Sequence, residues 1–229
     1  MSNGFSGQHV VITGGDGALG QAVVDAFVAA GAVCHLPILG PVATPPAPAA
    51  GVQLTGNIDL TDEHAVEAYY ASLPPIAASI HLAGGFTFKP IAATSRADLE
   101  RQLAINLFTT FFCCREAVKA MRKGGGGRIV NVGARVVEVP GANLTAYTAA
   151  KAAVTALTRA LAEEVRHDGI LVNAILPSII DTPANRAAMP DAKFDQWPKP
   201  AEVARTIVWL ASLENVLTSG ALVPVYGRA

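Results

Sequence analysis

The feature that most constrains this chain is a regular alternation of short apolar segments and longer helical ones, opened by a glycine-rich turn. Residues 8–13 form a short apolar run that predicts a buried strand, and residues 20–30 have the pattern of a helix that ends at Gly31. The turn between them runs Thr-Gly-Gly-Asp-Gly-Ala-Leu-Gly from Thr13 to Gly20. A strand, a glycine turn and a helix in this order are typical of the start of a parallel α/β sheet.

The same alternation continues to the end of the chain. Further strands are predicted at residues 32–36, 53–60, 79–82, 128–132, 171–176 and 221–225, and further helices at 61–72, 95–121, 147–167 and 200–211. The Pro- and Ala-rich segment 40–51 predicts an irregular connection. We therefore predict a single α/β domain over residues 1–229, a doubly wound (Rossmann) sheet of about seven parallel strands with helices on both faces.

Charge and hydropathy exclude several kinds of partner. The chain has 17 Lys and Arg against 18 Asp and Glu, so its formal net charge of -1 offers no basic field for nucleic acid or anionic lipid. No apolar run approaches the length that crosses a bilayer, and the N-terminus lacks the basic and apolar regions of a secretory signal. We expect a cytoplasmic protein that binds a small-molecule substrate and neither nucleic acid nor membrane.

The cysteines do not predict a metal site. Cys34, Cys113 and Cys114 have no metal-ligand spacing, and adjacent cysteines on a helix point to different faces. We expect buried thiols and no bound metal.

Ligands of such a sheet bind where the carboxyl ends of the strands meet. The segments at or directly after the carboxyl ends of predicted strands are 14–20, Asp59, 83–85, 133–134 and 177–182. We therefore expect these segments to lie along one edge of the sheet and to form the binding site.

The glycine-rich turn predicts a dinucleotide site. A helix N-terminus presents unpaired amides and a partial positive charge, which suit a pyrophosphate if the side chains are small. The spacing Gly-x-Gly-x-x-Gly in its strand-turn-helix context supports this interpretation, against the alternative of a purely structural turn. The predicted cofactor-binding residues here are Gly14, Gly15, Asp16, Gly17, Ala18, Leu19 and Gly20.

Tyr147 and Lys151 lie four residues apart on one helical face. Alone, the pair would suggest an amphipathic side chain and a solvated charge. Together with a dinucleotide turn, Tyr147 can be the acid that hydride transfer to a carbonyl requires. We expect the ammonium of Lys151 to lower the phenol pKa from about 10 by roughly three units, about 4 kcal/mol, and to donate to a ribose hydroxyl.

With these residues in hand, the chain resembles the short-chain dehydrogenase/reductase family over essentially its whole length. The family glycine motif is Thr-Gly-x-x-x-Gly-x-Gly, and Ala18 stands at its middle glycine. Asn106 matches the catalytic asparagine, and the resemblance implies that it holds a water connecting Lys151 to solvent. The alternative is an ordinary helix-interior amide bonded to backbone.

The resemblance also implies further cofactor contacts. Asp59 and Leu60 fall where the family contacts adenine, and Ala83, Gly84 and Gly85 fall at the end of its Asn-Asn-Ala-Gly motif. His81 and Leu82 replace the two asparagines. The nicotinamide-side loop matches at Pro177, Ile180 and Thr182, with Ser178 in place of the usual glycine.

One departure concerns the catalytic serine, which the family places thirteen residues before the tyrosine and which is Ala134 here. Dihydropteridine reductases have the same alanine, and other passages, such as 83–85, resemble that branch. An activated substrate, such as a quinonoid dihydropterin, would suffer less from the missing hydroxyl than an ordinary ketone. Alternatively, Arg135, Asn143 or Thr145 could supply the donor.

We expect Ala134, Phe86 and Trp197 to contact the substrate, with 185–197 as a mobile lid, although Trp197 could equally pack against the last helix. For the cofactor, NAD is preferred over NADP. The second strand runs into Leu-Pro-Ile-Leu with neither acid nor arginine, the phosphate turn contains Asp16, and no Lys or Arg lies between Gln21 and Lys89. As the family implies, we expect a homodimer or a homotetramer.

Three functions fit this pattern. The first is a nicotinamide-dependent oxidoreductase that transfers hydride to or from a small carbonyl or activated substrate, with Tyr147 as proton donor. The second is an ordinary ketone reductase or alcohol dehydrogenase in which another group replaces the serine. The third is a dinucleotide-binding sensor with little turnover, which the intact Tyr147, Lys151 and Asn106 oppose.

Overall fold

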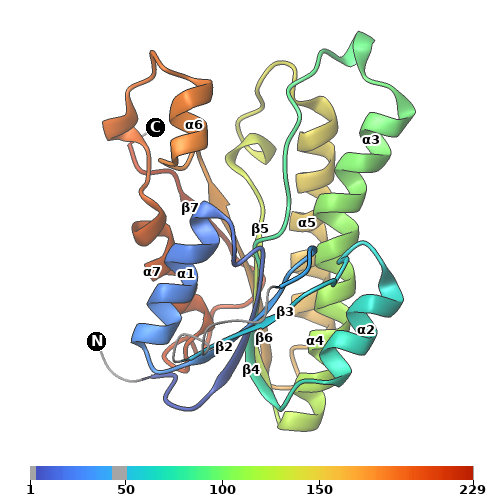
Figure 1. Cartoon of the computed structure of the whole chain (residues 1–229), viewed down its shortest axis with the longest axis vertical. Coiled ribbons are helices and arrows are strands. Elements are labelled where there is room, and N and C mark those ends of the chain that lie inside the picture. The colour runs from blue at the N-terminus through green and yellow to red at the C-terminus, as the bar shows by residue number, and fades with distance from the viewer. Residues whose placement is uncertain (1–3, 43–50, 229) are drawn as a thin grey trace.

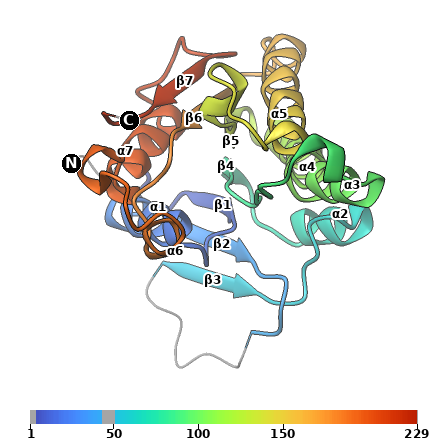
Figure 2. The same cartoon turned by 90° about the horizontal axis from the view of Figure 1, so that it is seen from above.

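The computed structural model describes residues 4–42 and 51–228. Its centre is one sheet of seven parallel strands in the order β3-β2-β1-β4-β5-β6-β7 (Figures 1 and 2). The strands are β1 His9–Thr13, β2 Val33–Pro37, β3 Val52–Thr55, β4 Ile76–His81, β5 Gly127–Val132, β6 Ile170–Pro177 and β7 Leu222–Val225. The order reverses between β1 and β4, so the predicted doubly wound fold is confirmed and its binding edge lies at the carboxyl ends of these strands.

Helices cover both faces of the sheet (Figure 1). Helices α1 (Ala18–Ala29) and α7 (Pro200–Ala211) pack together on one face. Helices α2 (Glu63–Ala71), α4 (Thr109–Gly124) and α5 (Thr145–Glu164) cover the other. Each strand is therefore buried on both sides, which explains why the strands are nearly continuous apolar runs in the sequence.

Two apolar cores fill the spaces between the sheet and its helices. Ile12, Phe27 and Ile207 are fully buried in the core under α1 and α7. Met121 and Ile129 are fully buried in the core under α4 and α5. Burying a side chain of this size contributes about 1.5–3 kcal/mol. The three cysteines are free and buried, as predicted.

The third strand is shorter than the predicted range 53–60, because β3 ends at Thr55. Asn57 then adopts a left-handed backbone with a φ of 59°. The carboxylate of Asp59 accepts hydrogen bonds from the backbone amide and the hydroxyl of Thr61, at 2.8 and 2.7 Å. These local bonds form a turn that competes with strand geometry.

The predicted helix 95–121 is interrupted. A capping box at Ser95 and Asp98 starts α3 (Arg96–Leu103), a π-helical segment follows at Ala104–Phe108, and α4 continues to Gly124. Such π segments occur often at functional sites, and Asn106 lies in the middle of this one.

The segment expected to be a mobile lid contains regular secondary structure, and its mobility stays a prediction. Pro183–Ala188 forms the short helix α6, whose N-cap Thr182 accepts a hydrogen bond from the amide of Asn185 at 3.2 Å. Of the connection predicted at 40–51, residues 43–50 lie outside the described residues. Within the described ranges, no helix has the length and apolar character needed to cross a bilayer.

Candidate active site

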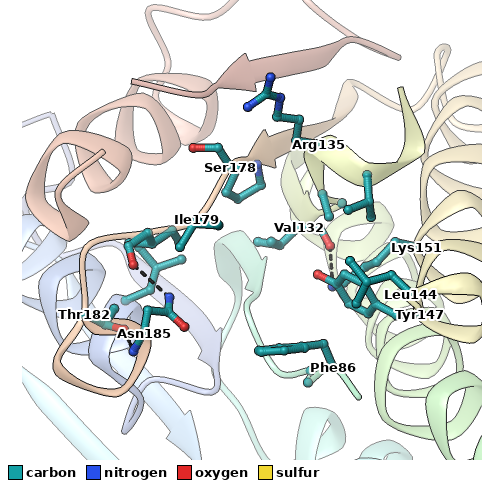
Figure 3. Close-up of a pocket in the computed structure, with 18 of the residues that line it drawn as sticks. Phe86, Val132, Arg135, Leu144, Tyr147, Lys151, Ser178, Ile179, Thr182 and Asn185 are labelled. Atoms are coloured by element: carbon teal, nitrogen blue, oxygen red, sulfur yellow. Dashed lines mark hydrogen bonds between the residues drawn. The ribbon is translucent and has the colours of Figure 1, made fainter. Parts of the chain in front are cut away.

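A cavity of about 670 Å³ opens at the carboxyl ends of β4, β5 and β6 (Figure 3). In Figure 3, Tyr147 and Lys151 face the loop of Ile179, Thr182 and Asn185 across it. The lining residues are Leu19, Leu82, Gly84, Gly85, Phe86, Phe88, Val132, Gly133, Ala134, Arg135, Val136, Val139, Leu144, Tyr147, Lys151, Pro177, Ser178, Ile179, Ile180, Thr182, Asn185 and Met189. Ten predicted site residues therefore meet here: Leu19, Gly84, Gly85, Phe86, Ala134, Tyr147, Lys151, Pro177, Ile180 and Thr182.

The glycine turn is folded tightly against its surroundings. Gly14 has a φ of 64°, and a Cβ atom there would lie 2.9 Å from the backbone nitrogen of Ala83. A Cβ on Gly15 would lie 2.6 Å from the Leu36 side chain, and one on Gly20 would overlap the carbonyl oxygen of Gly14. Gly14 and Gly20 therefore require glycine, because a Cβ there would meet backbone atoms, whereas at Gly15 the Leu36 side chain would have to move.

This turn fits the phosphates of a dinucleotide. Helix α1 begins after Gly17, which offers no side-chain cap, and its first turn contains no acidic residue. Its amides are therefore available to an anion. Asp16, Gly17 and Ala18 belong to this turn, and Asp59 and Leu60 follow β3 at the same edge of the sheet, but none of the five lines the cavity.

The end of β4 is held by side chains from two other elements. The hydroxyl of Thr13 accepts from the amide of Ala83 at 3.2 Å. The amide of Asn106 donates to the carbonyl of Gly85 at 2.9 Å, and its oxygen accepts from the amide of Gly85 at 3.3 Å. Asn106 is fully buried and also donates to the carbonyl of Gln102 at 3.0 Å. The Asn106 side chain is thus an amide inside a helix that bonds to backbone, as the alternative interpretation proposed. Its role in holding a water stays a prediction.

Lys151 is committed to the protein in this structure. Its ammonium donates to the carbonyl of Val132 at 2.8 Å, and the residue is 6% exposed. A Cβ on Gly84 would lie 3.4 Å from Nζ of Lys151 and 2.7 Å from Oδ1 of Asn106, so all three residues meet at one point. Burial lowers the pKa of Lys151 to about 8, because a desolvated ammonium is disfavoured.

Tyr147 differs electrostatically from the prediction. Burial raises the pKa of its phenol to about 12, rather than Lys151 lowering it. Desolvation disfavours the phenolate, and the ammonium of Lys151 is directed to the carbonyl of Val132. The ring of Phe86 lies 6.0 Å from that of Tyr147, centroid to centroid, and contributes to this apolar environment.

Ala134 lies on the cavity wall and is 6% exposed, so no hydroxyl occupies the position of the family serine. Of the three substitutes considered from sequence, Arg135 lines the cavity, whereas Asn143 and Thr145 do not. The carbonyl of Asn143 instead accepts from the amide of Lys89 at 2.7 Å. Arg135 is therefore the only one of the three in position to reach a ligand.

The structure places Trp197 outside the cavity, contrary to its predicted contact with substrate. Trp197 is 7% exposed and its ring lies 5.0 Å from that of Phe194, centroid to centroid. The guanidinium of Arg186 covers Phe194 and pairs with Asp181 at 2.6 Å. Trp197 thus packs against Phe194 of its own segment instead of lining the cavity.

A buried polar network lies directly behind the end of β4. His81, which replaces the first family asparagine, is 1% exposed. Its Nδ1 lies 2.8 Å from Oδ1 of Asn131, and its Nε2 lies 2.8 Å from the hydroxyl of Ser79. Asn131 donates in turn to Thr158 of α5 at 3.0 Å, and Tyr70 bonds Ser79 at 2.8 Å. The network links β4, β5, α2 and α5 behind the cavity.

Several wall residues carry no sequence signal. Val139 and Met189 line the cavity from loops, and Leu144 lines it from the position directly before α5. Isolated apolar residues in irregular segments are common on protein surfaces, so only the folded chain distinguishes these.

Comparison with known proteins agrees with this fold. A family profile described as short chain dehydrogenase matches residues 8–193. A short-chain type dehydrogenase/reductase of Picea abies is 34% identical over 61% of this chain, and the match spans only 55% of that protein. Galactitol 2-dehydrogenase of Rhizobium johnstonii is 33% identical over 96% of this chain and 94% of its own length. A solved structure of an ElxO variant with NADPH bound superimposes with a TM-score of 0.87 at 22% identity, over 96% of this chain and 98% of that one.

Proposed function

The chain belongs to the short-chain dehydrogenase family, and from this premise we propose that it transfers hydride between a nicotinamide cofactor and a small carbonyl compound or the corresponding alcohol. The observation that carries the proposal is the meeting of Tyr147 and Lys151 with Gly84 and Gly85 in one cavity, above a glycine turn that fits phosphates. The galactitol 2-dehydrogenase relative supports an alcohol and its ketone as the substrate pair.

The cofactor, when bound, supplies or accepts the hydride. The glycine turn and the N-terminus of α1 would hold its pyrophosphate, and Lys151 would exchange its bond to Val132 for a ribose hydroxyl. Tyr147 would donate a proton to the carbonyl oxygen as that oxygen gains negative charge. The wall around Tyr147 is largely apolar, which favours proton transfer from the phenol over transfer from solvent.

The raised pKa of Tyr147 favours one direction at neutral pH. With a pKa of about 12 the phenol is protonated at pH 7, and it can give its proton to an alkoxide, which is a stronger base than a phenolate. Alcohol oxidation needs the phenolate, which forms only as the pH rises. We therefore propose that reduction is the direction favoured near neutrality.

NAD is the cofactor that we propose. The chain carries no Lys or Arg before Lys89, so β1 to β4 offer no guanidinium or ammonium to a ribose phosphate. The turn also contains the carboxylate of Asp16, which disfavours a further anion. Measured NADH and NADPH dissociation constants would test this, and tighter binding of NADPH would refute it.

The missing serine hydroxyl separates two substrate classes. Because residue 134 is alanine, the wall offers no hydroxyl there to donate to the substrate beside Tyr147. This favours a carbonyl or imine that is already activated, such as a quinonoid dihydropterin. A simple ketone would depend more on the absent hydroxyl. Replacing Ala134 by Ser should therefore raise kcat/KM for simple ketones more than for activated substrates.

The testing experiment measures NADH oxidation with quinonoid dihydropterin, with activated ketones and with simple ketones, for the wild type, Tyr147→Phe and Ala134→Ser. Tyr147→Phe should reduce turnover by at least about a hundredfold while NADH still binds, because only the proton donor is lost. Unchanged turnover would refute the role of Tyr147. Tight NADH binding with no turnover of any compound would instead support the dinucleotide sensor.

We also propose that the chain forms a homodimer or homotetramer through the outer face of α4. Phe111 of α4 is 45% exposed, and Phe108, the last residue of the π segment before α4, is 44% exposed, although large aromatic side chains are usually covered. Light scattering should give an oligomer for the wild type and a smaller species for Phe111→Glu. A monomeric wild type would refute this proposal.

A further inference from the structure

Arg135 occupies a distinctive place in the cavity. It begins a short 3-10 turn, Arg135–Val137, directly after the alanine that stands for the family serine. In Figure 3 its guanidinium lies near Ser178, at the end of the site away from Phe86. In this view the guanidinium points away from Phe86 and Tyr147.

Among the residues that the structure describes, none accepts a hydrogen bond from Arg135. Its Nε is buried and has no hydrogen-bond partner among the described residues. No carboxylate of the described chain lies within 4.0 Å of its guanidinium, which is positioned by stacking 5.2 Å from the ring centroid of Tyr226. The nearby carboxylate of Glu138 accepts instead from the hydroxyl of Tyr226 at 3.1 Å. A buried, unpaired donor is costly, so a ligand that pairs it gains free energy.

The charged residues in the cavity wall are all positive among the residues that the structure describes. No Asp or Glu is among the described residues that line the cavity, and its two cations are Arg135 and Lys151. Lys151 is already bonded to the carbonyl of Val132. Arg135 is thus the uncommitted cation of a largely apolar cavity.

From these observations we propose that the substrate carries a carboxylate, which Arg135 binds, so that the enzyme acts on an oxo acid or the matching hydroxy acid. The proposal rests on the proposed function and names its substrate class. A guanidinium presents two parallel N–H donors that match the two oxygens of a carboxylate. The single available cation suits one negative charge, and the stacking on Tyr226 fixes the plane of the fork.

The same contact gives selectivity. A neutral substrate of equal size would leave the guanidinium of Arg135 without an ionic partner, whereas a carboxylate would accept hydrogen bonds from it. An oxo acid would thereby be held with its carboxylate at Arg135 and its carbonyl towards Tyr147. This positioning compensates in part for the hydroxyl missing at Ala134, because it fixes the carbonyl without a second donor.

The experiment compares three oxo acids of increasing length, pyruvate, acetoacetate and levulinate, with their methyl esters. The readout is the ratio of kcat/KM for each acid to that for its ester. In the wild type, kcat/KM for the best acid should be higher than kcat/KM for its ester. Arg135→Gln should lower the ratio of the two values by about tenfold or more. Arg135→Lys should fall between them, because it keeps the charge but loses the fork. Arg159→Gln, which removes an exposed arginine of α5 outside the cavity, should keep the wild-type ratio.

The outcomes separate this proposal from the proposed function. If the esters are reduced but the ratio does not depend on Arg135, the carboxylate proposal is overturned and the oxidoreductase assignment stands. If NADH binds but no compound is reduced, each acid is titrated into the NADH complex and its binding is followed by NADH fluorescence. Acid binding that Arg135→Gln does not weaken overturns the proposal. If neither NADH nor NADPH binds, the proposed function fails and the proposal fails with it. Circular dichroism spectra like that of the wild type show that each variant is folded.

Discussion

Acid should destabilise this protein through one buried histidine, His81. The residue is 1% exposed and lies between Asn131 and Ser79. With Nδ1 donating to the Asn131 oxygen and Nε2 accepting from the Ser79 hydroxyl, both ring nitrogens are satisfied in the neutral form. Protonation would place a charge in the core and add a proton at the nitrogen that accepts. Burial accordingly lowers the pKa of His81 from 6.5 to about 4.

The magnitude follows from linkage. The unfolded state takes up the proton near pH 6.5 and the folded state only near pH 4, so stability is complete above pH 6.5 and is lost as the pH falls towards 4. Each unit of pKa difference is worth about 1.4 kcal/mol, which gives about 3 kcal/mol over the whole window. Between pH 7 and pH 4.5 the loss due to this residue should be about 2 to 3 kcal/mol.

The assay is urea unfolding of the wild type and of His81→Asn at pH 7 and pH 4.5. The variant keeps a polar side chain but has no group that titrates there. Between pH 7 and pH 4.5, the free energy of unfolding should therefore fall by about 2 to 3 kcal/mol more in the wild type than in the variant. The exposed His64, replaced by Asn as a control, should give the wild-type dependence. Parallel pH dependence of the wild type and His81→Asn would refute the reasoning, because the burial of His81 would then carry no proton linkage.

Three further results are expected. Gly14→Val should abolish NADH binding in a fluorescence titration, because a side chain at a φ of 64° would press on Ala83 at 2.9 Å; retained affinity would contradict the fit of the turn. Asn106→Leu should lower the free energy of unfolding by about 1–3 kcal/mol, since it leaves the backbone of Gly85 unpaired, and an unchanged urea midpoint would argue against that bond network. The rate of alcohol oxidation should rise with pH as Tyr147 approaches its pKa of about 12; a plateau near neutrality would show that the phenol is acidified.

Local signals in the sequence were sufficient for the framework and for the order of the site along the chain. Pro200 at the start of α7 marks that helix to the residue, and Gly31, with a φ of 89°, ends the turn after α1 as predicted. The glycines of the first turn and the Tyr147 and Lys151 spacing also act over a few residues. Such features depend on backbone sterics and helical periodicity, which neighbouring residues determine.

The tertiary structure alone decided the electrostatics of the site and which side chains line its cavity. Lys151 turns to the carbonyl of Val132, burial raises rather than lowers the pKa of Tyr147, and Trp197 packs away from the cavity. The unpaired Nε of Arg135 and the π segment around Asn106 likewise have no local signature. All of these depend on desolvation and on partners brought from distant parts of the chain, and distance along a sequence does not encode which groups share one low-dielectric space.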